Sequence, residues 1–192
     1  MEKWDACSFA VNPDDLEGRI CYGGLDLSST TDITAFVLVF PPQDEDDKYA
    51  ILPYFWVPED TLELRVRRDH VPYDVWERQG FLQTTEGNVV HYGYIEKFIE
   101  RLGEKYNIRE IAFDRWGAVQ MVQNLEGMGF TVVPFGQGFK DMSPPTKELM
   151  KLTLEEHLAH GGHPVLRWMM DNIYIRTDPA GNIKADKEKS TE

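Results

Sequence analysis

The chain has 192 residues, the length of a single domain with enough residues to bury a sizeable core. Its composition, 42% hydrophobic and 28% charged, excludes a disordered or fibrous chain. The 33 acidic residues outnumber the 20 Lys and Arg residues, and the formal net charge of −13 excludes an overall electrostatic grip on nucleic acid, so any such contact needs a local basic strip or bound cations.

The first third of the chain consists mainly of short apolar stretches separated by turns. Residues 1–19 show little periodicity and are expected to be a lead-in or linker, ahead of a single domain over residues 20–192. Stretches rich in β-branched residues follow, joined by short polar connections. We expect them to form an antiparallel three-stranded meander over residues 20–27, 34–40 and 49–57.

In the middle of the chain a helical period replaces the strand pattern. Residues 58–68 are suited to a helix with arginines in its last turn, and residues 82–90 to a short extended segment. From Tyr92 onward, apolar residues recur at the spacing of one helical face. The order of elements after that helix predicts a βαβ unit with parallel strands, namely strand 108–113, helix 116–128 and strand 130–134.

Prolines and glycines bound the last long helix that the sequence predicts. Ser143-Pro144-Pro145 is expected to open it, and Gly161-Gly162 to close it after about His160. The tail adds apolar runs at 165–170 and 173–176. The complete order predicts an α/β fold in which a mixed β-sheet, an antiparallel meander followed by βαβ, is flanked by helices.

The number of cysteines and the length of the apolar runs indicate the cellular compartment in which the protein is found. Cys7 and Cys21 are the two cysteines, too few for a disulfide framework or a cysteine-based zinc site. No apolar run approaches the roughly 20 residues that cross a bilayer, and the first residues lack a signal-peptide core. We therefore expect a soluble, cytosolic domain that does not bind membranes.

Two aspartates stand where predicted strands end. Asp26 follows Gly23-Gly24-Leu25 in an apolar strand, and strands that face a core rarely carry a carboxylate unless it is paired or holds a metal. Asp114 ends the predicted strand of the βαβ unit, at the edge where α/β sheets place ligands. If these strands are neighbours, the two carboxylates converge and repel each other unless a cation lies between them, and oxygen ligands suit Mg²⁺ or Mn²⁺.

Each of these aspartates also has a purely structural explanation. Asp26 could cap the turn that follows it, and Asp114 could be the N-cap of the next helix. Asp32 lies six residues after Asp26, where it could support the metal site or merely cap the same turn.

Two further groups of side chains allow other readings. His157, His160 and His163 invite a zinc site, but Gly161-Gly162 breaks the helix between them, and histidines at helix ends are the simpler account. The Arg65–Arg68 run is either a solvated helix end or a patch that contacts phosphates.

Three segments, in this order, resemble the nuclease domain of the large terminase subunits of tailed bacteriophages. They extend from about Arg19 to the end of the chain: Gly24-Leu25-Asp26-Leu27-Ser28-Ser29 with Asp32-Ile33-Thr34-Ala35; Ile111-Ala112-Phe113-Asp114-Arg115; and Leu166-Arg167-Trp168-Met169 with Asp186-Lys187-Glu188-Lys189-Ser190-Thr191.

The resemblance implies a ribonuclease H-like fold and a hydrolase that cuts concatemeric double-stranded DNA during viral genome packaging, by a two-metal mechanism with Mg²⁺ or Mn²⁺. Carried over by position, Asp26 and Asp114 are the catalytic metal ligands and Asp32 is the nearby supporting acid. The implied partners are the ATPase domain of the same full-length protein, the small terminase subunit and the portal, in the cytoplasm of the infected bacterial host cell.

The sequence departs from that family pattern in two respects. The family's third metal-binding aspartate lies shortly after the Lys-Ser-Thr run, whereas this chain stops at Glu192, and no P-loop for ATP occurs. The resemblance therefore implies a domain cut from a longer protein and truncated before its last acidic ligand, which would leave the fragment weak or inactive.

Three other functions fit parts of the pattern. An actin-like or sugar-kinase-like ATPase lobe also places Asp, Ser and Thr on a first hairpin, but then ATP should raise the melting temperature and Mn²⁺ alone should not. A non-catalytic docking module of the packaging machine would be indifferent to replacement of Asp26. A junction-resolving nuclease of the same fold would prefer branched DNA.

Overall fold

The centre of the molecule is a mixed β-sheet, described here from a computed structural model that covers residues 1–28, 30–114 and 119–190. In this part of the chain the sheet has seven strands in the order β4-β3-β2-β1-β5-β6, with β7 paired to β3. A separate two-stranded ribbon joins β8 to β9. The α/β class and the mixed sheet expected from the sequence are confirmed.

The predicted meander is confirmed, with bounds that follow the apolar stretches closely. Its strands are β1 (Ile20–Asp26), β2 (Thr34–Phe40) and β3 (Tyr49–Pro58), and both pairings are antiparallel. In β2 every second residue is buried, as the alternation of a strand with one core face requires.

The predicted βαβ unit is also present and adds the parallel part of the sheet. It consists of β5 (Asn107–Asp114), α5 (Val119–Gly127) and β6 (Val132–Phe135), and it follows α4 (Tyr92–Lys105). Strand β5 pairs in parallel with β6 on one side and with β1 on the other. The predicted helix start at Trp116 lies outside the described residues.

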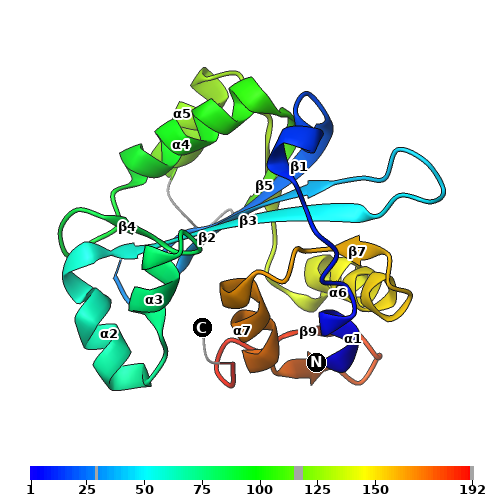
Figure 1. Cartoon of the computed structure of the whole chain (residues 1–192). Helices are drawn as coiled ribbons and strands as arrows, with labels where there is room; N and C mark the ends of the chain where they lie inside the picture. The colour runs from blue at the N-terminus through cyan, green and yellow to red at the C-terminus, as the bar shows by residue number, and fades with distance from the viewer. Residues whose placement is uncertain (29, 115–118, 191–192) are drawn as a thin grey trace.

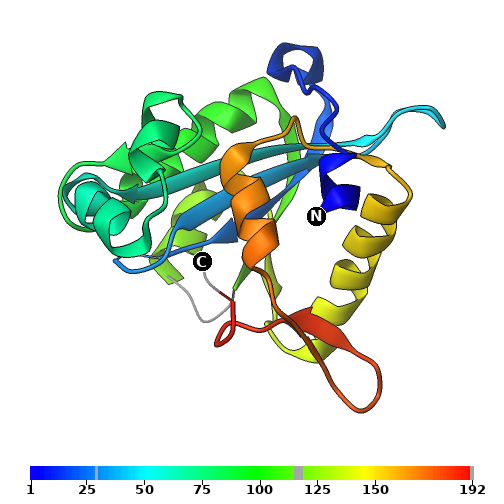
Figure 2. The same ribbon diagram turned by 60° about the horizontal axis from the view of Figure 1, so that its bottom comes forward.

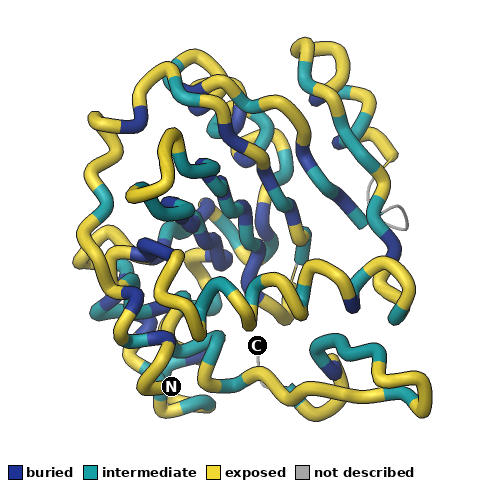
Figure 3. Tube along the Cα trace, turned by 90° about the vertical axis from the view of Figure 1, so that its right-hand side faces the viewer, coloured by how far each residue is buried: buried dark blue, intermediate teal, exposed yellow. Residues whose placement is uncertain are grey.

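Helices cover both faces of the sheet, as Figure 1 shows. Helices α4 and α5 lie on one face, where Ile95, Ile99 and Leu125 pack against Phe36 and Ile111 in the largest core cluster. In Figure 3 the buried residues gather in the strands of the sheet and the exposed ones in the outer loops. Among the helices of the described residues, none is long and apolar enough to cross a membrane.

The opposite face is covered in two separate places, as Figure 2 shows. Helix α7 (Pro164–Asn172) packs with α3 (Tyr73–Arg78) over β3, and α6 (Phe139–Leu154) packs with α1 (Glu2–Asp5) beside β7 (Leu158–Ala159). Helix α6 also borders the part of this face over β1 and β5.

Residues 1–19, which the sequence suggests are a lead-in, form α1 and a short 3-10 helix at Pro13–Leu16. Trp4, Cys7 and Leu16 are buried against the rest of the chain. Arg167 binds Asp5 through both its Nε and Nη2 atoms, at 2.7 and 3.0 Å. The segment is therefore packed onto the sheet and its helices.

The last long helix differs from its prediction. It begins at Phe139, before Pro144 and Pro145, and ends at Leu154. The two prolines sit in its second turn, where each removes one backbone hydrogen bond without ending the helix. The early end follows from tertiary structure, because Tyr49 N donates to His157 O at 2.9 Å and Leu158–Ala159 then pairs with β3 as β7.

The remaining elements are short and lie at the periphery. Residues 58–69 form a 3-10 turn and then α2, as expected, and residues 82–90 contain one short strand. The bounds are η2 (Glu59–Thr61), α2 (Leu62–Asp69), β4 (Gln83–Thr85), β8 (Ile175–Thr177) and β9 (Ile183–Ala185).

Candidate metal centre at the ends of strands β1 and β5

The structure brings Asp26 and Asp114 to the same level of the sheet. Strands β1 and β5 are parallel neighbours, Leu25 is in register with Phe113, and the two aspartates are the next residues. Neighbouring strands lie about 4.8 Å apart. Because Leu25 and Phe113 are buried on the α4–α5 side, the aspartates that follow them point to the opposite face. The sequence predicts that the two aspartates come together if their strands are neighbours, and in the structure these strands are neighbours.

A cavity of about 540 Å³ opens over this part of the sheet and includes both aspartates in its lining. The sheet contributes small residues, Gly24, Ala35 and Ala112, while β6 and α6 contribute larger apolar ones. A Cβ built on Gly24 would meet no atom of the described residues within 4 Å. The small side chains on this face therefore leave room beside the carboxylates.

Gly23 has a different reason for being a glycine. A Cβ at this position would lie 2.8 Å from Cε2 of Phe36, whose ring is fully buried in the core. The two glycines before Asp26 therefore serve opposite faces of β1, one for close packing and the other for the open cavity.

The electrostatics of this end of the sheet work against an ionised Asp26. Its pKa is raised chiefly because surrounding protein removes water from the carboxylate. Lys187 opposes this shift, and the negative charges of Asp114 and Asp32 add to it. Asp26 also keeps exposed surface. A bound cation would relieve this repulsion.

The turn after Asp26 is closed by other side chains. The hydroxyl of Thr34 donates to Ser28 O at 2.6 Å and accepts from Ser28 N at 3.0 Å, and Ser28 Oγ accepts from Asp32 N at 3.1 Å. Within the described residues, the Asp26 side chain takes part in no hydrogen bond of this turn. This disfavours the capping explanation for Asp26, while the N-cap explanation for Asp114 depends on residues 115–118, outside the described part.

Asp32 lies on the same loop and is exposed. Its carboxylate is near enough to raise the pKa of Asp26, so the three acids share one electrostatic environment. Across residues 1–28, 30–114 and 119–190, however, no group of three or more His, Cys, Asp or Glu side chains is arranged to hold a metal ion. The donor set suits a hard divalent cation in chemistry, with Asp26 and Asp114 at the ends of neighbouring strands and Asp32 on the adjoining loop.

The three histidines do not form a site together. His160 is buried, stacks on Trp4 at 4.2 Å between ring centroids, and its Nε2 lies 2.7 Å from Trp4 O. His163 caps α7 by accepting from Leu166 N, and burial lowers its pKa to about 4, with His160 adding to the shift. These contacts support the structural account that the sequence favours over zinc.

Two cationic residues near the candidate centre were not assigned to it from the sequence. Lys187 lies near enough to lower the pKa of Asp26, in a turn held by Asp186, whose Oδ1 accepts from the backbone N–H groups of Glu188 and Lys189 at 2.9 and 3.3 Å. Arg65 is buried and donates to Thr30 O at 2.9 Å, in the loop that carries Asp32. The positions of these residues in the sequence do not reveal either contact, although Lys187 lies in the segment 186–191 that resembles the terminase family.

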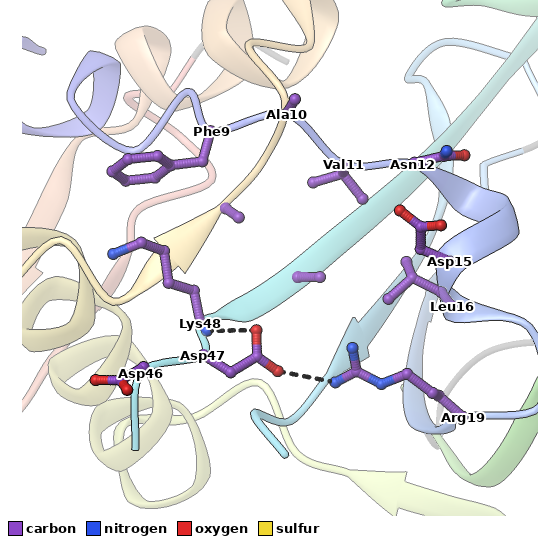
Figure 4. A pocket seen from close by; sticks show the side chains of 12 residues that line it. Phe9, Ala10, Val11, Asn12, Asp15, Leu16, Arg19, Asp46, Asp47 and Lys48 are labelled. Carbon is purple, nitrogen blue, oxygen red and sulfur yellow. Dashed lines mark hydrogen bonds and ion pairs between the residues drawn. The ribbon is translucent and has the colours of Figure 1, made fainter. Parts of the chain in front are cut away.

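A second cavity, of about 300 Å³, lies at the opposite end of β1 and is shown in Figure 4. Its cations already have partners: Arg19 Nη2 donates to Pro41 O at 2.8 Å and reaches Asp47 Oδ2 at 3.4 Å. Lys48 Nζ donates to Glu156 O and lies 4.3 Å from the centre of the Phe9 ring. Both cations of this cavity therefore have partners within the protein, which is typical of a structural contact.

Comparison with known proteins places this geometry in a family. The family described as "Terminase large subunit, endonuclease domain" matches residues 1–192. The terminase large subunit of Enterobacteria phage HK97 is 41% identical over 175 residues, which are 90% of this chain and 34% of that protein. Protein YmfN of Escherichia coli (strain K12) is 26% identical over an alignment 200 residues long that covers 99% of this chain and 44% of that protein. The chain thus spans less than half the length of either relative.

Solved structures agree with this result. The HK97 bacteriophage large terminase superposes with a TM-score of 0.88 and 38% identity, over 99% of this chain and 39% of that one. The large terminase nuclease from thermophilic phage G20c with bound magnesium shares the fold, with a TM-score of 0.52 and 14% identity over 95% of this chain and 86% of that one. The ribonuclease H-like fold class expected from the resemblance is confirmed.

Proposed function

Because the chain belongs to the family of terminase large subunit endonuclease domains, we propose that it is a divalent-metal-dependent nuclease domain that cuts concatemeric double-stranded DNA during phage packaging. One observation supports this activity most directly. Asp26 and Asp114 follow a registered residue pair on neighbouring parallel strands, and both line the same cavity. Two carboxylates so placed favour a cation between them.

The chain's own side chains have distinct tasks in this proposal. Asp26 and Asp114 are the ligands of the metal site, and Asp32 adds negative charge from the adjacent loop. The chemistry that divalent ions supply when bound is activation of a water nucleophile and stabilisation of the leaving 3′ oxygen in an in-line displacement. The rigid pairing of β1 with β5 holds the two carboxylates in place before substrate arrives, so that little reorganisation is needed.

The protein's charge also fits a metal-dependent contact with DNA. At a net charge of −13 the domain as a whole repels a polyanion, so a cation at the aspartates is one means of local approach. The proposal includes two bound ions, which are magnesium or manganese, and a third acidic ligand that follows the Lys189–Thr191 run.

The proposal also includes the partners of this domain. They are an ATPase domain of the same protein, the small terminase subunit and the portal, and they act together in the cytoplasm of the infected bacterium.

Cleavage of supercoiled plasmid in Mn²⁺, with EDTA as the blank, tests the activity. The assay should be run on this chain and on a form extended toward the length of its relatives. We expect Asp26→Asn and Asp114→Asn each to reduce cleavage by at least about 100-fold, because even residues behind metal ligands cost 10–100-fold when replaced.

Asp46→Asn is the matched control, since Asp46 is also an exposed acid but lines the opposite cavity. It should leave cleavage unchanged. Cleavage that survives both Asp26→Asn and Asp114→Asn, or that never appears in either form with any divalent metal, would rule the nuclease proposal out. A melting temperature raised by ATP without metal would favour the ATPase-lobe alternative instead.

A further inference from the structure

Helix α2 buries an arginine rather than an apolar side chain. Arg65 is 3% exposed, whereas the Arg67 side chain on the same helix is 81% exposed. Leu62 and Val66 already pack α2 against the apolar cluster over β3. Burying a guanidinium is costly unless its donors are satisfied, and an apolar residue would avoid that cost. The contacts of Arg65 therefore need an explanation beyond packing.

Its charge lies near Asp69 on the same helix, whose pKa it helps to lower, and its hydrogen bonds lead to the loop between β1 and β2. Arg65 Nη2 donates to Thr30 O at 2.9 Å, and Arg65 Nε donates to Thr61 Oγ1 at 3.3 Å. Thr61 in turn donates to Pro58 O at 3.2 Å, at the end of β3. The guanidinium thus ties the outer part of the loop to α2 and to the end of a central strand.

The same loop is fixed at its base beside Asp26. Thr34, which is fully buried, makes two hydrogen bonds with the backbone of Ser28, and Ser28 Oγ accepts from the N–H of Asp32. Asp32 therefore lies between an anchored base and the point that Arg65 holds. Its distance from Asp26 depends on both anchors.

We propose that Arg65 is a positioning residue that holds the β1–β2 loop so that the Asp32 carboxylate stays beside Asp26 and strengthens the binding of a divalent cation there. This inference rests on the proposed function. Arg65 touches neither the cation nor DNA in this role; it acts through the position of Asp32. The planar guanidinium suits the task because it binds a backbone carbonyl and a hydroxyl from fixed directions, which a lysine cannot do.

Calorimetric titration of Mn²⁺ into the protein without DNA tests this role independently of cleavage. We expect Arg65→Lys to raise the Kd for Mn²⁺ about tenfold, within the range seen when residues behind metal ligands are replaced. Thr61→Val removes the acceptor for Arg65 Nε together with the hydroxyl that donates to Pro58 O, and it should raise the Kd less, by roughly threefold. Arg67→Lys is the control on the same helix and should leave the Kd unchanged.

A double-mutant cycle identifies the route of the effect. If Arg65 acts through Asp32, Arg65→Lys should change the Kd little once Asp32→Asn is present. Full additivity of the two changes would overturn the inference. So would Kd values equal to that of the parent in both Arg65→Lys and Thr61→Val, even with a lower melting temperature, because that result describes a purely structural arginine.

Asp26→Asn separates failure of this inference from failure of the proposed function. If Asp26→Asn abolishes Mn²⁺ binding while Arg65→Lys and Thr61→Val do not weaken it, only the role of Arg65 is wrong. If Asp26→Asn binds Mn²⁺ like the parent, the metal centre itself is wrong and the role of Arg65 falls with it.

Discussion

At the Arg19 end of strand β1, Arg19 is paired with Asp47, whereas at the Asp26 end two carboxylates add to the rise in the pKa of Asp26 and Lys187 only partly opposes it. Arg19 reaches Asp47 and a backbone carbonyl, and the pKa of Asp47 is lowered, first by the N–H of Gln43. The pKa of Asp26 is raised, chiefly by burial, with Asp114 contributing. One seven-residue strand therefore joins a region where charges stabilise the fold to one where they oppose it.

This difference indicates where function was favoured over stability. At the first end, Asp47 is held by donors that the protein itself supplies, namely Arg19 and the N–H groups of Gln43 and Lys48. At the second end, Asp26 and Asp114 end neighbouring strands and the pKa of Asp26 is raised, and acids brought together in this way are more typical of functional sites than of structural ones. Substitutions at the two ends of β1 should therefore have different effects on stability and on metal binding.

The largest difference should appear in stabilisation by metal. Mn²⁺ at ten times its Kd contributes about 1.4 kcal/mol by mass action, which corresponds to a rise in Tm of roughly 3–6 °C for a chain of this length. Asp114→Asn should abolish this rise, and Asp46→Asn, in the acidic turn at the other end, should retain it. The measurement is thermal unfolding with and without Mn²⁺; equal shifts in both variants would mean that the ion binds the acidic surface generally.

Between the two ends, the adjacent glycines should respond unequally to an added methyl group. Gly23→Ala puts a Cβ 2.8 Å from the buried Phe36 ring, and overpacking of this kind costs about 1–3 kcal/mol. Gly24→Ala meets no atom within 4 Å in the part of the chain that the structure describes, and it should change stability by less than about 0.5 kcal/mol. Urea unfolding of both variants checks this, and similar losses would show that the cavity beside Gly24 is filled.

At the Arg19 end, Asp47→Asn should destabilise the protein at neutral pH by about 0.5–1 kcal/mol, the range for a partly exposed ion pair with hydrogen bonds. Because the folded-state pKa of Asp47 lies below 3.8, its contribution is present above that pH and disappears as the pH falls through the folded-state value. The two proteins should therefore converge in stability below about pH 3.8, which urea unfolding at several pH values would measure. A gap independent of pH would mean that the charge of Asp47 is not responsible.

The smallest effect is expected at the Asp26 end, where removal of the charge should stabilise the protein, whereas removal of the Asp47 charge destabilises it. The folded-state pKa of Asp26 lies above 3.8, so ionisation costs stability as the pH rises through that folded-state value. Asp26→Asn should consequently raise the Tm of the metal-free protein at pH 7 by about 1–2 °C, a small amount because solvent screens the carboxylate. A lower Tm at pH 7 would show that Asp26 supports the fold.

Much of the fold was predictable because burial leaves a local pattern in the sequence. The meander, the βαβ unit and α4 follow from alternation and from the helical period, and each is present with close to its expected bounds. The positions of Asp26 and Asp114 at strand ends were visible for the same reason. The start of α6 was not, since Pro144 and Pro145 suggested a helix beginning at residue 143 rather than 139.

Other features depended on contacts between distant segments. The packing of Trp4 and Cys7 beneath α6, and the pairing of residues 158–159 with β3, involve segments without a periodic signal of their own. Arg65 belongs to a run that reads as a solvated helix end, and its burial follows only from the loop that meets it.

The sequence by itself determined the elements, the mixed α/β class and the acids at the ends of two strands, because these are properties of short stretches of chain. Only the tertiary structure decided that β1 and β5 are parallel neighbours with Leu25 opposite Phe113. That register puts Asp26 and Asp114 together across a long interval of sequence. The physical reason is that electrostatic repulsion between carboxylates depends on distance in space, and their separation is set by strand pairing rather than by either strand alone.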